Sequence, residues 1–202
     1  MNPTMPRTTG AAPTPQAKDR FLEAAIFLMR QSGLSGAGIN QLISRSGAPK
    51  GSVYYHFPGG KQQIIGEALT IYGERVAAAF ERALSSRKKP GDKIRALFRF
   101  VADRFEEGAF EQSCAAGAVT LDLDAEVVAL RPVIAAAFAS WRSVIANHLP
   151  LRSRARRESL AGLVLSTIEG AYIRGRAEHS KKPFLEAGEW LARLAQSESG
   201  KS

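Results

Sequence analysis

The sequence predicts an all-α fold, in which an N-terminal head of three helices is joined to a larger C-terminal helical bundle, with about nine helices in total. Apolar residues recur three or four positions apart in nearly every segment, which is the spacing of one helical face. The period-two alternation of a half-buried strand is essentially absent. Short stretches containing Gly or Pro separate the segments, and these residues commonly end or begin helices.

The chain is predicted to begin with a disordered tail over residues 1–14, which are rich in Pro, Thr, Gly and Ala and show no periodicity. A first helix is predicted from Pro15 to Gln31, because a wide apolar stripe runs through it and Ser32-Gly33 follows it. This helix would brace the two shorter helices that come next.

Residues 38–61 are predicted to form two short helices joined by a tight turn, followed by the start of a longer helix. Gly47 can adopt the positive φ that ends a helix, and Pro49 suits the first turn of the next one. The apolar faces that close the two helices on each other consist of Ile39, Leu42, Ile43, Val53 and Phe57. With the first helix, this helix-turn-helix forms a compact head over residues 15–60.

The second short helix carries a polar and aromatic face opposite its apolar one. Lys50 and Tyr54 are four residues apart, as are Gly51 and Tyr55, and Ser52 lies close by. Duplex DNA suits this combination, because lysine reaches phosphates or guanine edges, hydroxyls reach phosphate oxygens, and an exposed helix fits the major groove. The alternative is that both tyrosines are half-buried core aromatics and that Lys50 is an ordinary solvated charge.

Positive charge is denser in the part of the chain that contains this helix. The formal net charge is +9, and residues 1–61 carry seven Lys or Arg against two Asp or Glu, whereas the remaining 141 residues carry twenty-one against seventeen. Such a basic surface binds DNA phosphates with salt-sensitive affinity, and it would equally suit RNA or an anionic membrane.

The segment Pro49-Lys50-Gly51-Ser52-Val53-Tyr54-Tyr55-His56-Phe57 resembles the recognition helix of TetR/AcrR-type transcriptional regulators. In that family a small residue, Lys-Gly, a hydroxyl or small residue, an aliphatic, Tyr, an aromatic and His-Phe are followed by a short link to Lys. The longer link Pro-Gly-Gly before Lys61 is similar to the LmrA/YxaF-like branch. Gly38 departs from the family pattern, which has Thr or Ser as the cap of the second helix, and it predicts a weaker cap.

The resemblance implies a ligand-responsive transcriptional regulator, a repressor by the family default with activation left open. It implies binding to a palindromic double-stranded DNA operator as a homodimer, and release by a small-molecule inducer. Lys61 would meet a DNA phosphate at the start of the helix that links head and body. The residues expected to bind DNA are Ala48, Pro49, Lys50, Gly51, Ser52, Tyr54, Tyr55, His56 and Lys61.

The rest of the chain, residues 61–202, is predicted to form a ligand-binding and dimerisation domain made of helices. Asp92 and Asp124 are each predicted to open a helix, and Pro132 either kinks the second of these or marks its true start. The resemblance implies dimerisation through the last two long helices. The predicted helices after the head span about 60–86, 92–105, 113–121, 124–149, 155–178 and 183–196.

Candidate effector-binding residues lie on the body helices and combine aromatic surface with a few polar groups. They are Phe98, Phe105, Cys114, Leu121, Trp141, Glu169 and Tyr172. The alternative for each is ordinary core packing. Glu169 is the best polar candidate, because it stands in an otherwise apolar stretch, although it would also suit a solvent-facing position.

The composition excludes several other classes of protein. The apolar share of 45% fits a globular core, and the single Cys114 cannot form an internal disulfide, which favours a reducing cytoplasm. No signal-peptide pattern is seen, and the most apolar early stretch, residues 21–29, contains Glu23 and is too short to cross a bilayer. We therefore expect a cytoplasmic protein without a membrane partner.

The remaining alternatives are an enzyme and a basic helical module that docks on RNA, membrane or protein without operator specificity. No catalytic constellation, metal-binding motif or cofactor loop is found, so no catalytic residue, metal or cofactor is predicted. Cys114 would carry a Cys-based enzyme or redox sensor, but no His lies near it in the sequence and buried inert thiols are common.

Overall fold

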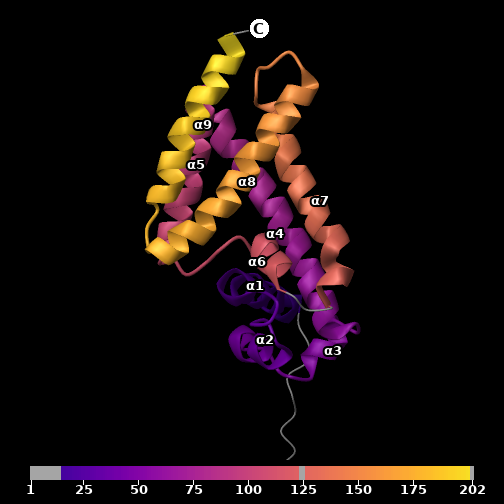
Figure 1. The fold of residues 1–202 in the computed structure, drawn as a ribbon. Helices are drawn as coiled ribbons and strands as arrows, with labels where there is room; N and C mark the ends of the chain where they lie inside the picture. The colour runs from indigo at the N-terminus through magenta and orange to yellow at the C-terminus, as the bar shows by residue number, and fades with distance from the viewer. Residues whose placement is uncertain (1–14, 123–125, 201–202) are drawn as a thin grey trace, which may run out of the picture.

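The computed structural model describes residues 15–122 and 126–200, and within these residues the chain forms nine α-helices and no strand (Figure 1). The predicted all-α fold is therefore confirmed. The helices are α1 Pro15–Ser32, α2 Ile39–Ser46, α3 Ser52–His56, α4 Gly60–Ser85, α5 Pro90–Glu107, α6 Ala115–Leu121, α7 Glu126–Asn147, α8 Arg154–Glu178 and α9 Lys182–Gly200.

Helices α1, α2 and α3 form the head, which lies at one end of the molecule in Figure 1. Gly47 ends α2 with φ 60°, in the left-handed region, as its position in the sequence predicts. Gly38 precedes α2 in an extended conformation and makes no side-chain cap, so the weaker cap is confirmed. The head is closed by Phe57, which is fully buried and meets the ring of Phe21 edge-on at 6.0 Å.

Helix α4 belongs to both parts of the molecule. Its first half packs against α1 through Ile64 and Ile65, and its second half enters the body, where Phe80 and Leu84 are buried. Its bounds agree with the predicted helix to one residue. The assignment of residues 15–60 and 61–202 to two domains stays a prediction, because α4 runs through both packing environments.

The body is built around long helix pairs. In it, α5 packs along α9, α7 packs along α4, and α8 contacts both α7 and α9, while α6 lies between α1 and α7. Trp141 of α7 is buried, and its Nε1 donates a hydrogen bond of 2.8 Å to the Gly73 carbonyl of α4. Gly73 permits this close approach, because a Cβ there would lie 3.1 Å from the Cβ of Ala137.

Some helix ends differ from the predicted ones. Helix α5 begins at Pro90, so Asp92 lies in its first turn and does not cap it; Pro suits that first position because its missing N–H has no partner there. Cys114, next to the predicted start at Ser113, caps α6. Pro132 lies inside α7, which excludes it as the start. The predictions for 1–14 and Asp124 fall outside the described residues.

One segment of the described residues, Val128–Asn147 in α7, is long and apolar enough to cross a membrane by length and composition alone, with a mean hydropathy of 1.3. In the structure this segment packs against α4 and α8, and its side chains Ile134, Trp141 and Ile145 are buried there. About 28% of this segment is buried inside the described part of the chain.

Candidate functional site

The outward face of α3 is open to solvent. Tyr54 and Tyr55 are 63% and 68% exposed, whereas Val53 and Phe57 are fully buried on the opposite side. Lys50 and Gly51 are also exposed, in the turn that leads into α3. The structure thus places a cation, two phenol groups and an accessible backbone segment on one projecting surface, which is the chemistry that phosphates and base edges require.

Ser52 stabilises the turn before α3 through hydrogen bonds to a carbonyl within that turn. The Ser52 backbone N–H and hydroxyl both donate to the Pro49 carbonyl, at 2.9 and 2.5 Å, and the residue is only 3% exposed. Ala48 is buried as well, at 6%. The side chains of Ser52 and Ala48 are therefore not exposed on the outward face, because the Ser52 hydroxyl bonds a local carbonyl, and their contact with DNA stays a prediction.

His56 and Lys61 flank this surface and are half-buried. The His56 ring meets Tyr55 edge-on at 5.0 Å, and in the described part of the chain its Nε2 is buried without a hydrogen-bond partner. Lys61 lies in the first turn of α4. Contact of either residue with DNA stays a prediction, as it does for Pro49, Lys50, Gly51, Tyr54 and Tyr55.

Two of the cavities in the described part of the chain share lining residues. The larger, about 860 Å³, lies between the end of α1, helix α6 and helix α8, and its wall includes Leu121 and Ile173. The smaller, about 290 Å³, lies among α1, α4, α5, α7 and α8. Both are lined by Cys114, Glu169 and Tyr172, so the two spaces meet at these three side chains.

Glu169 places a carboxyl group where the cavities meet. Burial raises its pKa to about 7, against the opposing effect of a hydrogen bond with the Cys114 thiol. Burial, with the nearby Glu169 charge, raises the pKa of the Cys114 thiol well above its ordinary value. Because a thiol nucleophile or redox sensor needs a lowered pKa, this environment does not support either role for Cys114.

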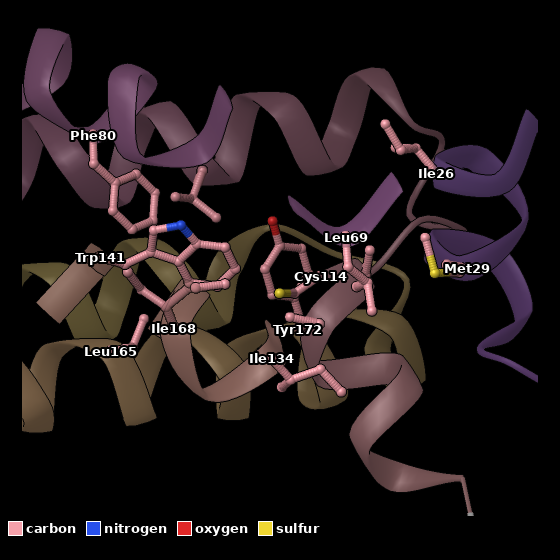
Figure 2. Close-up of a cluster of buried hydrophobic side chains, with 14 of the residues drawn as sticks. Ile26, Met29, Leu69, Phe80, Cys114, Ile134, Trp141, Leu165, Ile168 and Tyr172 are labelled. Carbon is pink, nitrogen blue, oxygen red and sulfur yellow. The ribbon is translucent and has the colours of Figure 1, made fainter. Parts of the chain in front are cut away.

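Two tyrosines complete the polar part of this region. Burial raises the pKa of Tyr72 and of Tyr172 well above the ordinary phenol value, so both hydroxyls remain protonated hydrogen-bond donors. Figure 2 shows Tyr172 and Cys114 in one buried cluster with Trp141. Trp141 meets Tyr72 edge-on at 6.1 Å, which makes one wall of the smaller cavity aromatic.

The larger cavity is bordered by residues of the head as well as of the body. Asp122, directly after α6, accepts hydrogen bonds from the backbone N–H groups of Leu34 and Ser35 in the turn between α1 and α2, the second at 3.2 Å. Gly33 in the same turn has φ 66°, and a Cβ there would lie 2.6 Å from the Asp122 Oδ2. Glycine is therefore favoured at this position for two reasons, the positive φ and the close approach of Asp122.

Further hydrogen bonds join the end of α1 to the body. The Ser113 N–H donates to the Arg30 carbonyl at 2.7 Å, and the Arg30 Nε donates back to the Ser113 carbonyl at 3.1 Å. Arg176 of α8 donates to the Gln31 carbonyl at 3.0 Å. The cavity wall and the head thus share a hydrogen-bonded border.

Comparison with known proteins identifies the two parts of the chain separately. The family model described as bacterial regulatory proteins, tetR family, matches residues 21–68, and the model of the transcriptional regulator LmrA/YxaF-like C-terminal domain matches residues 90–190. This chain belongs to the TetR family of transcriptional regulators. Within the TetR family it falls in the LmrA/YxaF-like branch, as its Pro-Gly-Gly-Lys link indicates.

Curated TetR-family relatives match over most of their length. The HTH-type transcriptional regulator YxaF of Bacillus subtilis is 28% identical over 182 residues, covering 89% of this chain and 95% of YxaF. LmrA of the same organism is 29% identical, covering 84% and 91%. The regulator Rv0196 of Mycobacterium tuberculosis is 31% identical, covering 83% and 88%. These relatives favour a DNA-binding regulator over a basic module for RNA, membrane or protein.

Solved structures share the fold. A TetR regulatory protein from Rhodobacter sphaeroides superposes with a TM-score of 0.79 at 19% identity, covering 88% of this chain and 97% of that protein. The TetR-family regulator CifR, in a cysteine mutant solved with a 26-base-pair operator DNA, gives 0.75 at 19% identity, covering 94% and 98%. The head and bundle arrangement is thus that of the TetR family.

The predicted effector-binding residues fall into two groups. Cys114, Leu121, Glu169 and Tyr172 line the larger cavity, and Trp141 lines the smaller one. Phe98 and Phe105 line neither cavity, so the structure does not support them as effector-binding residues, and that role stays a prediction. They pack between α5 and α9, where Phe105 lies 5.3 Å from the ring of Phe184 and a Cβ at Gly188 would lie 2.5 Å from that of Phe98.

Several lining residues were missed by sequence reasoning. Tyr72 belongs to α4, which is predicted to link head and body, and Arg30 belongs to α1, which is predicted to support the other head helices. Both helices form walls of the smaller cavity. Phe138, Ile173 and Arg176 line the larger one. A phenol group within the apolar stripe of α4 was the available signal for Tyr72, since a tyrosine on a buried face must place its hydroxyl against polar groups or a cavity.

Proposed function

We propose that this regulator binds a palindromic operator as a homodimer and that a small molecule in the cavities between α1, α6 and α8 releases it. The observation that supports this most directly is the pairing of two features on one chain. An exposed Lys-Gly-x-x-Tyr-Tyr surface projects from the head, and a cavity of about 860 Å³ is bordered by the same head. That volume falls in the range of small-molecule sites.

Recognition of DNA is assigned to α3 and its preceding turn. Lys50 and the two exposed tyrosines would contact phosphates and base edges, and Lys61 would contact the backbone. A helix of five residues reads only a few base pairs, so a specific operator requires two copies of it in successive major grooves. Repression is the expected outcome, with activation as the second possibility.

Dimerisation is assigned to α8 and α9. Large apolar side chains are exposed on both helices, and Trp190 is 70% exposed. Gly170 on α8 has open space around it, which allows a second helix to approach closely. A second copy seated on this surface would cover Leu163, Ile173, Leu185, Trp190 and Leu194.

Release by an effector follows from the border between cavity and head. Gln31, Ser32 and Gly33 at the end of α1 line the larger cavity, together with Asp122 of the body. A ligand that favours one arrangement of this border shifts the population of head positions by its differential affinity for the two arrangements. Because a DNA-binding regulator acts on the chromosome, we expect the protein in the cytoplasm, where the chromosome of its bacterial relatives lies.

Binding to an inverted repeat near the coding region tests this proposal. Fluorescence anisotropy with that duplex and with a shuffled duplex of equal length should show preference for the repeat that survives moderate salt. Lys50→Ala and Tyr54→Ala should each weaken operator binding by about tenfold or more, at about 1–3 kcal/mol per contact. Lys88→Ala, at an exposed lysine of the α4–α5 loop, serves as the control.

Size-exclusion chromatography should show that all three variants keep the oligomeric state of the wild-type protein. Unchanged operator affinity in both head variants would refute the DNA-binding role of α3. Equal affinity for the repeat and the shuffled duplex would refute operator specificity and revive docking without sequence preference.

A further inference from the structure

Glu169 differs from the other charged side chains that line the two cavities, because among the described residues its carboxyl has neither an ion-pair partner nor a backbone N–H donor. Among the described residues no Lys, Arg or His forms an ion pair with it, and its neighbour is the Cys114 thiol. The other charged lining groups all have partners. Glu23 and Arg75 form an ion pair, and so do Arg104 and Glu107. Arg30 and Arg176 donate hydrogen bonds to the Ser113 and Gln31 carbonyls, and Asp122 accepts from two backbone N–H groups.

The surroundings of Glu169 suit a cation better than an anion. Phe80, Trp141 and Tyr72 form an aromatic group on the facing helices, with Trp141 6.3 Å from Phe80 and 6.1 Å from Tyr72 between ring centres. Aromatic faces attract organic cations through their electron density. Figure 2 shows Phe80 and Trp141 side by side in the same buried cluster as Tyr172.

An unpaired carboxylate in such a place is costly, since burial removes its water and no ion pair among the described residues replaces it; Arg30 lines the same cavity, but its Nε donates to the Ser113 carbonyl. A bound cation would supply that charge. A neutral ligand would have to accept a hydrogen bond from the protonated acid instead, and an anionic ligand would add repulsion. The geometry therefore distinguishes ligand classes by charge.

We propose that the effector is an organic cation, with a protonated amine seated on the Glu169 carboxylate and an apolar or aromatic body in the adjoining cavities. This inference rests on the proposed function and names the chemical class of its effector. The volumes of about 860 and 290 Å³ accommodate a drug-sized molecule that extends from Glu169 into either space.

Proton linkage gives an independent readout. With the pKa of Glu169 raised to about 7, about half of the carboxyl groups carry a proton at pH 7, and a bound cation favours the ionised form. The other titratable groups that line the two cavities are Cys114 before α6, Tyr72 of α4 and Tyr172 of α8, with the charged groups Glu23 and Arg30 of α1, Arg75 of α4, Arg104 of α5, Asp122 after α6 and Arg176 of α8. Burial raises the pKa of the thiol and of both phenols well above their ordinary values, so the released proton is assigned to Glu169.

The test uses the full chain and three matched probes, 2-(2-naphthyl)ethylamine, 2-(2-naphthyl)ethanol and 3-(2-naphthyl)propanoate. Isothermal titration at pH 7 should show the amine binding at least about tenfold more tightly than the alcohol, with the propanoate weakest. Titration in two buffers of different ionisation enthalpy should show release of up to about half a proton with the amine and none with the alcohol.

Glu169→Gln should remove the preference for the amine and the proton release, while Glu169→Asp, which keeps the charge, should retain the preference. Glu74→Gln, at an exposed glutamate of α4, should behave as wild type. Binding of none of the probes by the wild-type protein, equal binding of amine and alcohol, or a preference that survives in Glu169→Gln would each overturn the inference.

Operator binding by the ligand-free wild-type protein distinguishes a failure of the cation inference from a failure of the proposed function. If the protein binds the inverted repeat but shows no preference for the amine, the cation inference fails and the regulator function stands. If it binds no specific duplex, the proposed function fails, whatever the probes do.

Discussion

Gly33→Ala is expected to destabilise the chain more than Gly47→Ala, although both glycines have nearly the same backbone conformation. Their φ angles are 66° and 60°, so an alanine at either position carries backbone strain of about 1–2 kcal/mol. At Gly47 the added Cβ meets nothing within 4 Å, whereas at Gly33 it lies 2.6 Å from the Asp122 Oδ2. Gly33→Ala must therefore also displace the Asp122 carboxylate.

The additional loss comes from the hydrogen bonds that Asp122 accepts from the Leu34 and Ser35 backbone. Bonds to a charged group contribute about 1.5–3 kcal/mol, and the lower value applies because the Ser35 contact is exposed. Gly33→Ala should thus cost about 1.5 kcal/mol more than Gly47→Ala. Urea unfolding followed by circular dichroism measures the difference as a shift in midpoint at constant slope.

The same pair of variants in an Asp122→Ala background isolates the contact. There the extra loss at Gly33 should shrink, because its Cβ would then closely approach only the Ala118 carbonyl oxygen, at 3.2 Å. Equal losses in the wild-type background, or a difference of unchanged size without Asp122, would refute the close approach of this carboxylate to the α1–α2 turn.

Three further predictions concern the body. Burial raises the pKa of Glu169 in the folded state to about 7, above the ordinary value of 4.5, so between these pH values the folded protein binds a proton that the unfolded chain does not. The stability of the wild-type protein relative to Glu169→Gln should therefore fall as the pH rises from about 4.5 to 7. Urea midpoints measured across that range test this, and a difference that does not change with pH would contradict it. Trp141→Phe should lower the free energy of unfolding by about 1–3 kcal/mol, since the buried Gly73 carbonyl loses its 2.8 Å donor; an unchanged melting midpoint would contradict this. Trp190→Ala should shift sedimentation profiles toward monomer while leaving the helical content unchanged, and an unshifted profile would remove Trp190 from the dimer surface.

The fold was predictable because helical spacing and Gly or Pro positions carry most of the needed information. Gly47 and Gly60 both adopt the positive φ that marks a helix boundary, and α4 ends one residue from its predicted limit. Where the prediction failed, local alternatives competed. Proline begins α5 two residues before Asp92, and Cys114 takes the capping position at the start of α6.

The candidate sites were predictable to different degrees. The outward face of α3 follows from periodicity, since Val53 and Phe57, four positions apart, are buried, whereas Tyr54 and Tyr55 between them are exposed. The burial of Ser52 was not predictable, because periodicity does not reveal a bond from its hydroxyl to a nearby carbonyl. The packing of Phe105 against α9 was not predictable either, because spacing identifies an inward face but not whether a helix or a cavity lies opposite.

Helix α6 is secured at both of its ends to the same short stretch of the head. Before it, Ser113 exchanges two hydrogen bonds with Arg30, and after it, Asp122 binds the backbone that follows Gly33. These bonds join both ends of a seven-residue helix to the last turn of α1 and the residues after it, so a displacement of α6 would have to break them or move that part of the head. They form a connection between body and head that is separate from α4.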